Sequence, residues 1–184
     1  GVDNPEDRTG SDRCLVGGVG AAGPPIQNPF TTSGGTQIVQ TRSEVAILAE
    51  MNHDVHIVRL NVRHQTPAVR QWMGDAVGWW EGDTLVVETT GFRAEEGNRA
   101  AYLLSPDAKV TERFHRVSPT ELRYEFTVDD PATYTQPWRG EMPLRADKGV
   151  IYEYACHEGN YSLANILQGA RQAERNAIKA AATK

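Results

Sequence analysis

The spacing of hydrophobic residues along this chain changes near residue 159. Between 36 and 158, apolar residues alternate with polar ones in short runs bounded by turn-forming residues, which is the pattern of half-buried β-strands. The clearest run is 122–128, whose inward-facing side chains are expected to be Leu122, Tyr124, Phe126 and Val128. Beyond 159 the apolar spacing becomes 3.6, which predicts one helix with an apolar stripe formed by Leu163, Ile166, Leu167 and Ala170.

The individual runs predict seven or eight short antiparallel strands, with the hairpin turns at 81–83, 118–121 and 146–149. These strands are drawn from nine candidate runs: 36–40, 45–50, 54–60, the residues before 81, 84–90, 110–117, 122–128, 134–144 and 150–156. This set of elements favours a mainly β protein with a closed or nearly closed barrel, and a β-sandwich is the alternative.

The chain divides into three segments of one domain. Residues 1–35 are rich in Gly and Pro without a sustained period, so we expect an irregular N-terminal arm. The barrel is expected to span 36–158, and the helix, 159–184, to pack on the barrel. Gly18-Val19-Gly20 is followed by Pro24-Pro25 instead of a helix, so no nucleotide cofactor is predicted, nor any other cofactor.

Charge excludes some classes of partner. The 184 residues carry 19 basic and 24 acidic side chains, a net charge of −5, which argues against a nucleic-acid binder. No apolar run is long enough to span a membrane. Basic residues predominate in 161–184, which is typical of a solvated helix face. The alternative interpretation of this basic segment is a docking surface for a partner or for a second copy in a homo-oligomer. Because the chain starts at Gly1 without a leader-like stretch, we expect it to be processed or trimmed.

The densest polar cluster lies at the predicted strand-to-helix corner. There His157 and Glu158 are candidates for a catalytic acid–base pair, because histidine titrates near neutral pH. Glu153, Asn160 and Tyr161 are candidate ligand-binding residues at the same corner. The alternative is a purely structural corner, in which Asn160 caps the helix and Glu158 interacts with its dipole.

A second candidate couple is Asp54 and His56, which share one face of an extended segment and would face the barrel lumen. The alternative is a polar strand end. His53 points to the opposite face, so this segment alone cannot hold a metal, and no metal site is predicted. We expect Asp54 or His56 to meet His157 or Glu158 in one cavity, where a shared metal ion is the less favoured alternative.

The third cluster combines tryptophans with a carboxylate: Trp72, Asp75 and Trp80. Aromatic rings beside a carboxylate suit sugars and other amphipathic ligands, so these residues are candidate ligand-binding groups. The alternative is that the tryptophans belong to the core at the ends of the barrel.

Several motifs, taken in order, resemble a family of secreted, functionally uncharacterised bacterial proteins. They are Glu50-Met51-Asn52-His53-Asp54, Arg70-Gln71-Trp72-Met73-Gly74-Asp75, Trp80-Glu81-Gly82-Asp83-Thr84-Leu85-Val86-Val87, and 124–131 and 152–161. The resemblance covers most of 3–175. It implies a secreted or periplasmic location and no particular activity. Gly78-x-Trp80 is also similar to a motif of lipocalin-like barrels, which adds modest support for a barrel.

The two cysteines, Cys14 and Cys156, are too far apart in sequence for a zinc motif. They are either two reduced, buried thiols or a disulfide. The oxidising compartment implied by the resemblance favours the disulfide. A covalent tie at Cys14 would also hold an arm that has few apolar residues to anchor it.

Two functional hypotheses follow from these residues. The first is a secreted β-barrel enzyme, a hydrolase or lyase, that acts on a small polar or sugar-like substrate by His/carboxylate acid–base chemistry. The second is a non-catalytic ligand-binding or assembly module of the periplasm or cell exterior. Imidazole and carboxylate groups inside the barrel would favour the enzyme, because burial of such groups without a use is costly.

Overall fold

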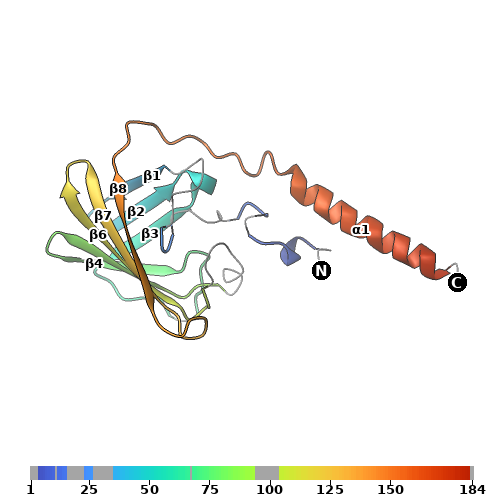
Figure 1. Ribbon diagram of the computed structural model, residues 1–184, viewed down its shortest axis with the longest axis horizontal. Coiled ribbons are helices and arrows are strands. Elements are labelled where there is room, and N and C mark those ends of the chain that lie inside the picture. Colours follow the sequence, from blue (N-terminus) through green and yellow to red (C-terminus); the bar gives the residue numbers. More distant parts are fainter. Residues whose placement is uncertain are drawn as a thin grey trace.

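The computed structural model describes residues 4–10, 12–15, 23–26, 35–66, 68–93 and 104–182. One eight-stranded, curled sheet forms a half-barrel, and one helix follows it at the C-terminus (Figure 1). The strands are β1 (Thr36–Gln40), β2 (Glu44–Ala49), β3 (Val55–Leu60), β4 (Asp75–Glu81), β5 (Thr84–Thr90), β6 (Lys109–Ser118), β7 (Glu121–Asp129) and β8 (Trp138–Arg145). The helix is α1 (Tyr161–Ala182), and short 3-10 turns occur at Pro5–Asp7 and Met51–His53. The prediction of a mainly β, barrel-like fold is confirmed.

The order of strands in the sheet is the order of the sequence, β1 to β8. All neighbours are antiparallel except β3 and β4, which are parallel and pair only from Val58↔Ala76 to Leu60↔Gly78. The prediction of an entirely antiparallel sheet is therefore wrong at this step. The connection 61–74 carries the chain back across the sheet, and the alternation within a strand says nothing about the direction of its neighbour.

The hairpins at the ends of β4–β5 and β6–β7 are confirmed. Gly82 adopts a φ of 59° in the two-residue turn between β4 and β5, a conformation that Gly tolerates without steric cost. The predicted strand at 150–156 is wrong, because this segment is not paired in the sheet. Val150 and Tyr152 are exposed there, so the apolar residues of this alternating segment do not form a buried face.

The core lies on the concave face of the half-barrel. Tyr124, Phe126 and Val128 of β7 are buried there, as predicted. The part of the arm at 24–26 is buried against the same core, and the Ile26 N–H donates a hydrogen bond to Tyr124 Oη at 2.8 Å. The arm therefore contributes to the core through a specific contact with β7.

The arm and the start of α1 are held together. Cys14 and Cys156 form a disulfide, as predicted, which joins the arm to the segment that precedes α1. Asn160 Nδ2 donates to the Asp12 carbonyl at 2.7 Å, and Asn160 Oδ1 accepts from the Leu163 N–H at 3.2 Å, which confirms Asn160 as the helix cap.

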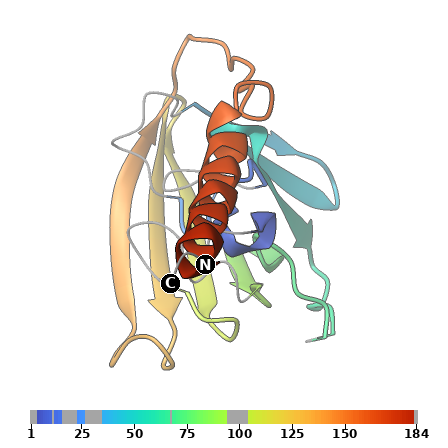
Figure 2. The same cartoon turned by 90° about the vertical axis from the view of Figure 1, so that its right-hand side faces the viewer.

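The helix does not lie along the sheet but extends away from it (Figures 1 and 2). Its predicted apolar stripe is the less exposed side, since Leu167 is buried and Leu163 and Ile166 are half-buried. The expected packing of the helix along the barrel is therefore not seen. The disulfide before the helix and its cap, Asn160, join the start of α1 to the arm. No helix in the described part of the chain is long and apolar enough to cross a membrane.

Candidate functional site

A cavity of about 590 Å³ lies beside the first half of β3. β4 pairs only with residues 58–60, the second half of β3. The first half of β3 is therefore not paired with the segment that leads into β4. The cavity lies at this unpaired half, and its wall includes 52–57, 70–74, Arg93 and the arm residue Cys14. The parallel step in the sheet thus creates the cavity, which we call the β3 cavity.

His56 contributes a buried imidazole to the β3 cavity. Its side chain is on the concave face of β3 and only 2% exposed, and Nε2 lies 3.4 Å from Thr89 Oγ1. Among the described residues, Nδ1 has no hydrogen-bond partner. Burial lowers the pKa of His56 to about 4, because the imidazolium form loses its hydration. The ring is therefore neutral at neutral pH and can accept a proton.

Asp54 also belongs to the wall of the β3 cavity. The turn that precedes it is strained, since Asn52 and His53 both have left-handed φ values, 58° and 47°. Asn52 Nδ2 donates to Asp54 Oδ1 at 3.3 Å, and both side chains are buried. The strained turn thus places a hydrogen-bonded carboxylate two residues before His56. Asp54 and His56 thus both line the β3 cavity.

Trp72 forms another part of the wall, as expected for a ligand-binding aromatic residue. The guanidinium of Arg93 lies 4.4 Å from the centre of the Trp72 ring. Arg70, also in the wall, forms an ion pair with Asp107 at 2.8 Å. The β3 cavity therefore combines an aromatic surface and guanidinium groups with the imidazole and carboxylate.

The predicted corner cluster does not join the β3 cavity. His157 and Glu158 are exposed and are not among the residues that line it. Glu153 and Asn160 line a separate cavity of about 430 Å³ beside the Cys14–Cys156 disulfide. Tyr161, at the start of α1, is 77% exposed.

The physical reason is that 150–156 is not a strand of the barrel, so the corner lies on the connection to α1. The expected meeting of Asp54 or His56 with His157 or Glu158 is therefore wrong. No group of three or more His, Cys, Asp or Glu side chains within the described ranges is arranged to hold a metal ion.

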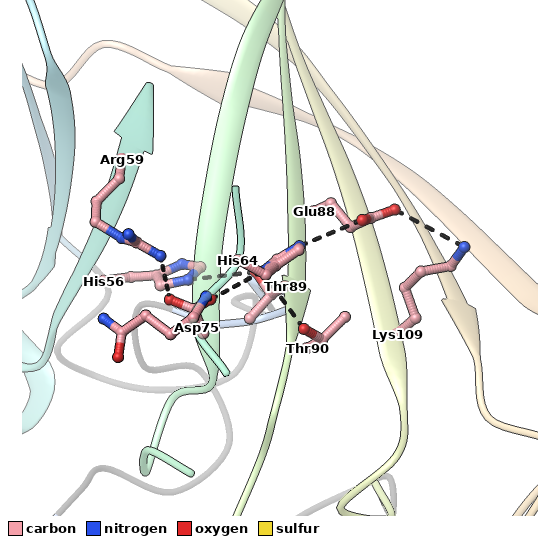
Figure 3. Close-up of polar contacts among 9 residues, drawn as sticks. His56, Arg59, His64, Asp75, Glu88, Thr89, Thr90 and Lys109 are labelled. Atoms are coloured by element: carbon pink, nitrogen blue, oxygen red, sulfur yellow. Dashed lines mark hydrogen bonds and ion pairs between the residues drawn. The ribbon is translucent and has the colours of Figure 1, made fainter. Parts of the chain in front are cut away.

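Asp75 lies outside the β3 cavity, on the convex face of the sheet, where it anchors a network of charges (Figure 3). Asp75 Oδ1 accepts from Arg59 Nη2 at 2.6 Å, and Oδ2 contacts His64 Nδ1 at 2.9 Å and the Gln65 N–H at 2.8 Å. Burial would raise the pKa of Asp75, but these hydrogen bonds outweigh it and hold the pKa below its ordinary value. The prediction that Asp75 binds a ligand is replaced by this structural role.

The network continues from His64 to β5 and β6. His64 Nε2 lies 3.3 Å from Glu88 Oε1, and Glu88 Oε2 lies 3.8 Å from Lys109 Nζ (Figure 3). His64 belongs to the 61–74 connection, so the network fixes this connection to the convex face of the sheet. Sequence reasoning missed His64, because the 61–74 connection has no periodic pattern that would assign it a face.

A second missed group is Glu112, which lies on the concave face of β6 and is fully buried. Its Oε1 accepts a hydrogen bond from Tyr124 Oη at 2.6 Å, and Oε2 has no partner within the described chain. Burial raises the pKa of Glu112 to about 7, although hydrogen bonds from Tyr124 and the Ile26 N–H oppose the shift. The available signal was its position between Val110 and Phe114, two apolar residues of the same face.

Trp80 is far from Trp72, at the opposite end of β4. It lines a further cavity near the β4–β5 turn and is 43% exposed. The three predicted aromatic-cluster residues therefore separate: Trp72 lies in the β3 cavity, Asp75 in the convex-face network and Trp80 at the other end of the half-barrel.

Comparison with protein-family models, curated proteins and solved structures gives no significant match to this chain. The resemblance to a secreted bacterial family stays a prediction that rests on the motifs. The geometry of the sites consequently carries the functional argument alone.

Proposed function

We propose that this protein is an exported enzyme that acts on a small polar or sugar-like substrate in the β3 cavity, by hydrolysis or elimination. The observation that carries the proposal is the Nδ1 atom of His56. It is buried, without a hydrogen-bond partner among the described residues, and belongs to a side chain in the wall of a ligand-sized cavity. An unpartnered polar atom in such a place is costly unless a ligand or water uses it.

His56 has the protonation state that a general base needs. With a pKa of about 4, it is neutral at neutral pH and can take a proton from a water molecule or from a carbon of the substrate. Asp54, buried in the same wall, would in its ionised form stabilise the imidazolium produced in that step. In this proposal His56 is the catalytic base and Asp54 its electrostatic partner.

The rest of the wall suits the proposed substrate class. The Trp72 ring and the Arg93 guanidinium stacked on it form a mixed aromatic and cationic part of the wall, which suits an amphipathic or anionic sugar-like substrate. The disulfide supports export, since such bonds persist in oxidising compartments. We therefore propose a secreted or periplasmic location.

The test is turnover of 4-nitrophenyl glycosides, read as nitrophenolate release, together with glycosides of uronic acids, where elimination produces an ultraviolet-absorbing double bond. His56→Asn should reduce kcat by about 10²–10⁴-fold, the usual contribution of a general base. His115→Asn is the matched control, because His115 lies on β6 and is not among the residues of the β3 cavity wall. For the wild type, kcat/KM should fall as pH drops through about 4, where His56 becomes protonated.

Equal activity of His56→Asn and the wild type would refute the assignment of the base. If glycosides bind in the β3 cavity but neither reaction occurs, the non-catalytic ligand-binding module is the correct function. That alternative uses the same cavity and predicts that Trp72→Ala weakens binding while His56→Asn leaves it nearly unchanged.

A further inference from the structure

Another cavity, of about 420 Å³, lies at the end of the half-barrel opposite the β3 cavity. We call it the mouth cavity. Its floor is the concave face of the sheet, where Val45, Ile47, Leu85 and Phe114 are all buried. Such a volume is within the range of small-molecule sites, roughly 300–1,000 Å³.

The sides of the mouth cavity are also apolar but remain accessible. Trp80 of β4 is 43% exposed and Ile38 of β1 is 38% exposed, although both border the buried floor. Large apolar side chains around a concave, apolar floor mark a surface that gains from contact with an apolar ligand. The edge of the sheet at β1 leaves this surface accessible, because among the described residues no strand pairs with β1 on its outer side.

Polar groups occur in the mouth cavity only at its rim: Gln40, Asp83 and Arg116. Arg116 follows Phe114 on the concave face of β6 and is exposed. Arg116 Nη1 donates a long hydrogen bond, 3.4 Å, to the Pro119 carbonyl, and the other donors of the guanidinium can bind an anion. The rim therefore places the guanidinium of Arg116 at the entrance of an apolar cavity. The rim also carries the carboxylate of Asp83, on the β4–β5 turn.

We propose that the mouth cavity binds an aliphatic carboxylate, with its hydrocarbon chain over Phe114 and its carboxylate at Arg116. This proposal does not depend on the proposed enzymatic function, because the two cavities share no residue. Burial of the hydrocarbon supplies the affinity, and the guanidinium selects the charge of the head group.

Calorimetric titration with dodecanoate, below its micelle threshold, tests the proposal. We expect saturable binding of one molecule with a negative heat-capacity change, the signature of apolar burial. Dodecanol and dodecylammonium are the head-group controls and should bind more weakly, in that order, because Arg116 repels a cation. Arg116→Gln should remove the preference for dodecanoate over dodecanol.

Variants locate the site. Trp80→Ser, and Leu122→Trp, which narrows the cavity, should each weaken dodecanoate binding by at least about tenfold. Val117→Gln is the matched control, since Val117 belongs to the same β6–β7 hairpin, is 54% exposed and is not part of the lining. Thermal unfolding of each variant identifies any loss of folding, and the exposed Trp80 makes Trp80→Ser the safer variant.

Absence of dodecanoate binding to the wild type would overturn the site. An affinity equal to that of the wild type in both Trp80→Ser and Leu122→Trp would overturn it as well. Stronger binding of dodecylammonium would overturn the head-group assignment in favour of Asp83. His56→Asn should bind dodecanoate like the wild type, which separates this result from the outcome for the β3 cavity.

Discussion

Replacement of Glu112 by Gln should stabilise the protein above neutral pH and change the slope of stability against pH. Glu112 is fully buried on the concave face of β6, and only one of its oxygens is bonded, to Tyr124 Oη at 2.6 Å. Gln has the same shape and keeps an oxygen that can accept this hydrogen bond. The substitution therefore removes the ionisation of the side chain with little change in packing.

The magnitude follows from the shifted pKa of Glu112. Burial raises this pKa from 4.5 to about 7, so the folded protein holds the proton in a pH range where the unfolded chain releases it. Stability therefore decreases as pH rises from 4.5 through about 7, by about 1.4 kcal/mol per pH unit and by about 3 kcal/mol in total. Glu112→Gln lacks this loss, so its advantage over the wild type should grow by that amount.

The assay is urea unfolding of both proteins at a series of pH values on either side of this range, followed by tryptophan fluorescence. The control is Glu141→Gln, which removes an exposed carboxylate from the neighbouring edge strand, β8. A difference between Glu112→Gln and the wild type that does not change with pH would refute the reasoning. It would mean that the carboxyl group is hydrated or paired in the folded protein.

Two further perturbations address the convex-face network and the arm. Asp75→Asn should lower the free energy of unfolding by about 2–3 kcal/mol at neutral pH, because charge-assisted hydrogen bonds to Arg59 and His64 are lost. The loss should shrink as pH falls below 3.8, where Asp75 of the wild type also becomes protonated, and equal urea midpoints at neutral pH would contradict it. The double variant Cys14→Ser/Cys156→Ser removes a cross-link between residues 142 apart and should cost at most about 4–5 kcal/mol. Limited proteolysis should then cleave 1–35 faster, and an unchanged cleavage rate would show that other contacts hold the arm.

The barrel-like fold could be predicted because most of its elements are encoded locally. The alternation in 122–128 identifies the buried face of β7, and Gly82 identifies the turn after β4. The direction of β4 could not be predicted, since it depends on where the aperiodic connection 61–74 crosses the sheet. The segment 150–156 misled for a related reason: its alternation is that of a strand, but the sheet ends at β8.

The candidate site was predictable where two residues belong to the same extended segment. Asp54, which directly precedes β3, and His56 share a wall because an extended backbone places alternate residues on one side. The prediction that the cluster at His157 lies near His56 was wrong, because it depended on the relative position of two segments that are distant in the sequence. Glu112 could have been found from the sequence, as a carboxylate at an inward position of β6, whereas His64 has no such signal.

The sequential order of the strands has a consequence for how the chain folds. Every pairing except β3–β4 joins consecutive antiparallel strands, so the sheet consists of two meanders, β1–β3 and β4–β8. Each meander can form by zippering from its own turns, at the low loop-closure cost of local contacts. Their docking requires closure of the 61–74 loop for only three residue pairs, Val58↔Ala76 to Leu60↔Gly78. We therefore expect assembly of the half-barrel to be a late step, which would complete the β3 cavity at the same time as the fold.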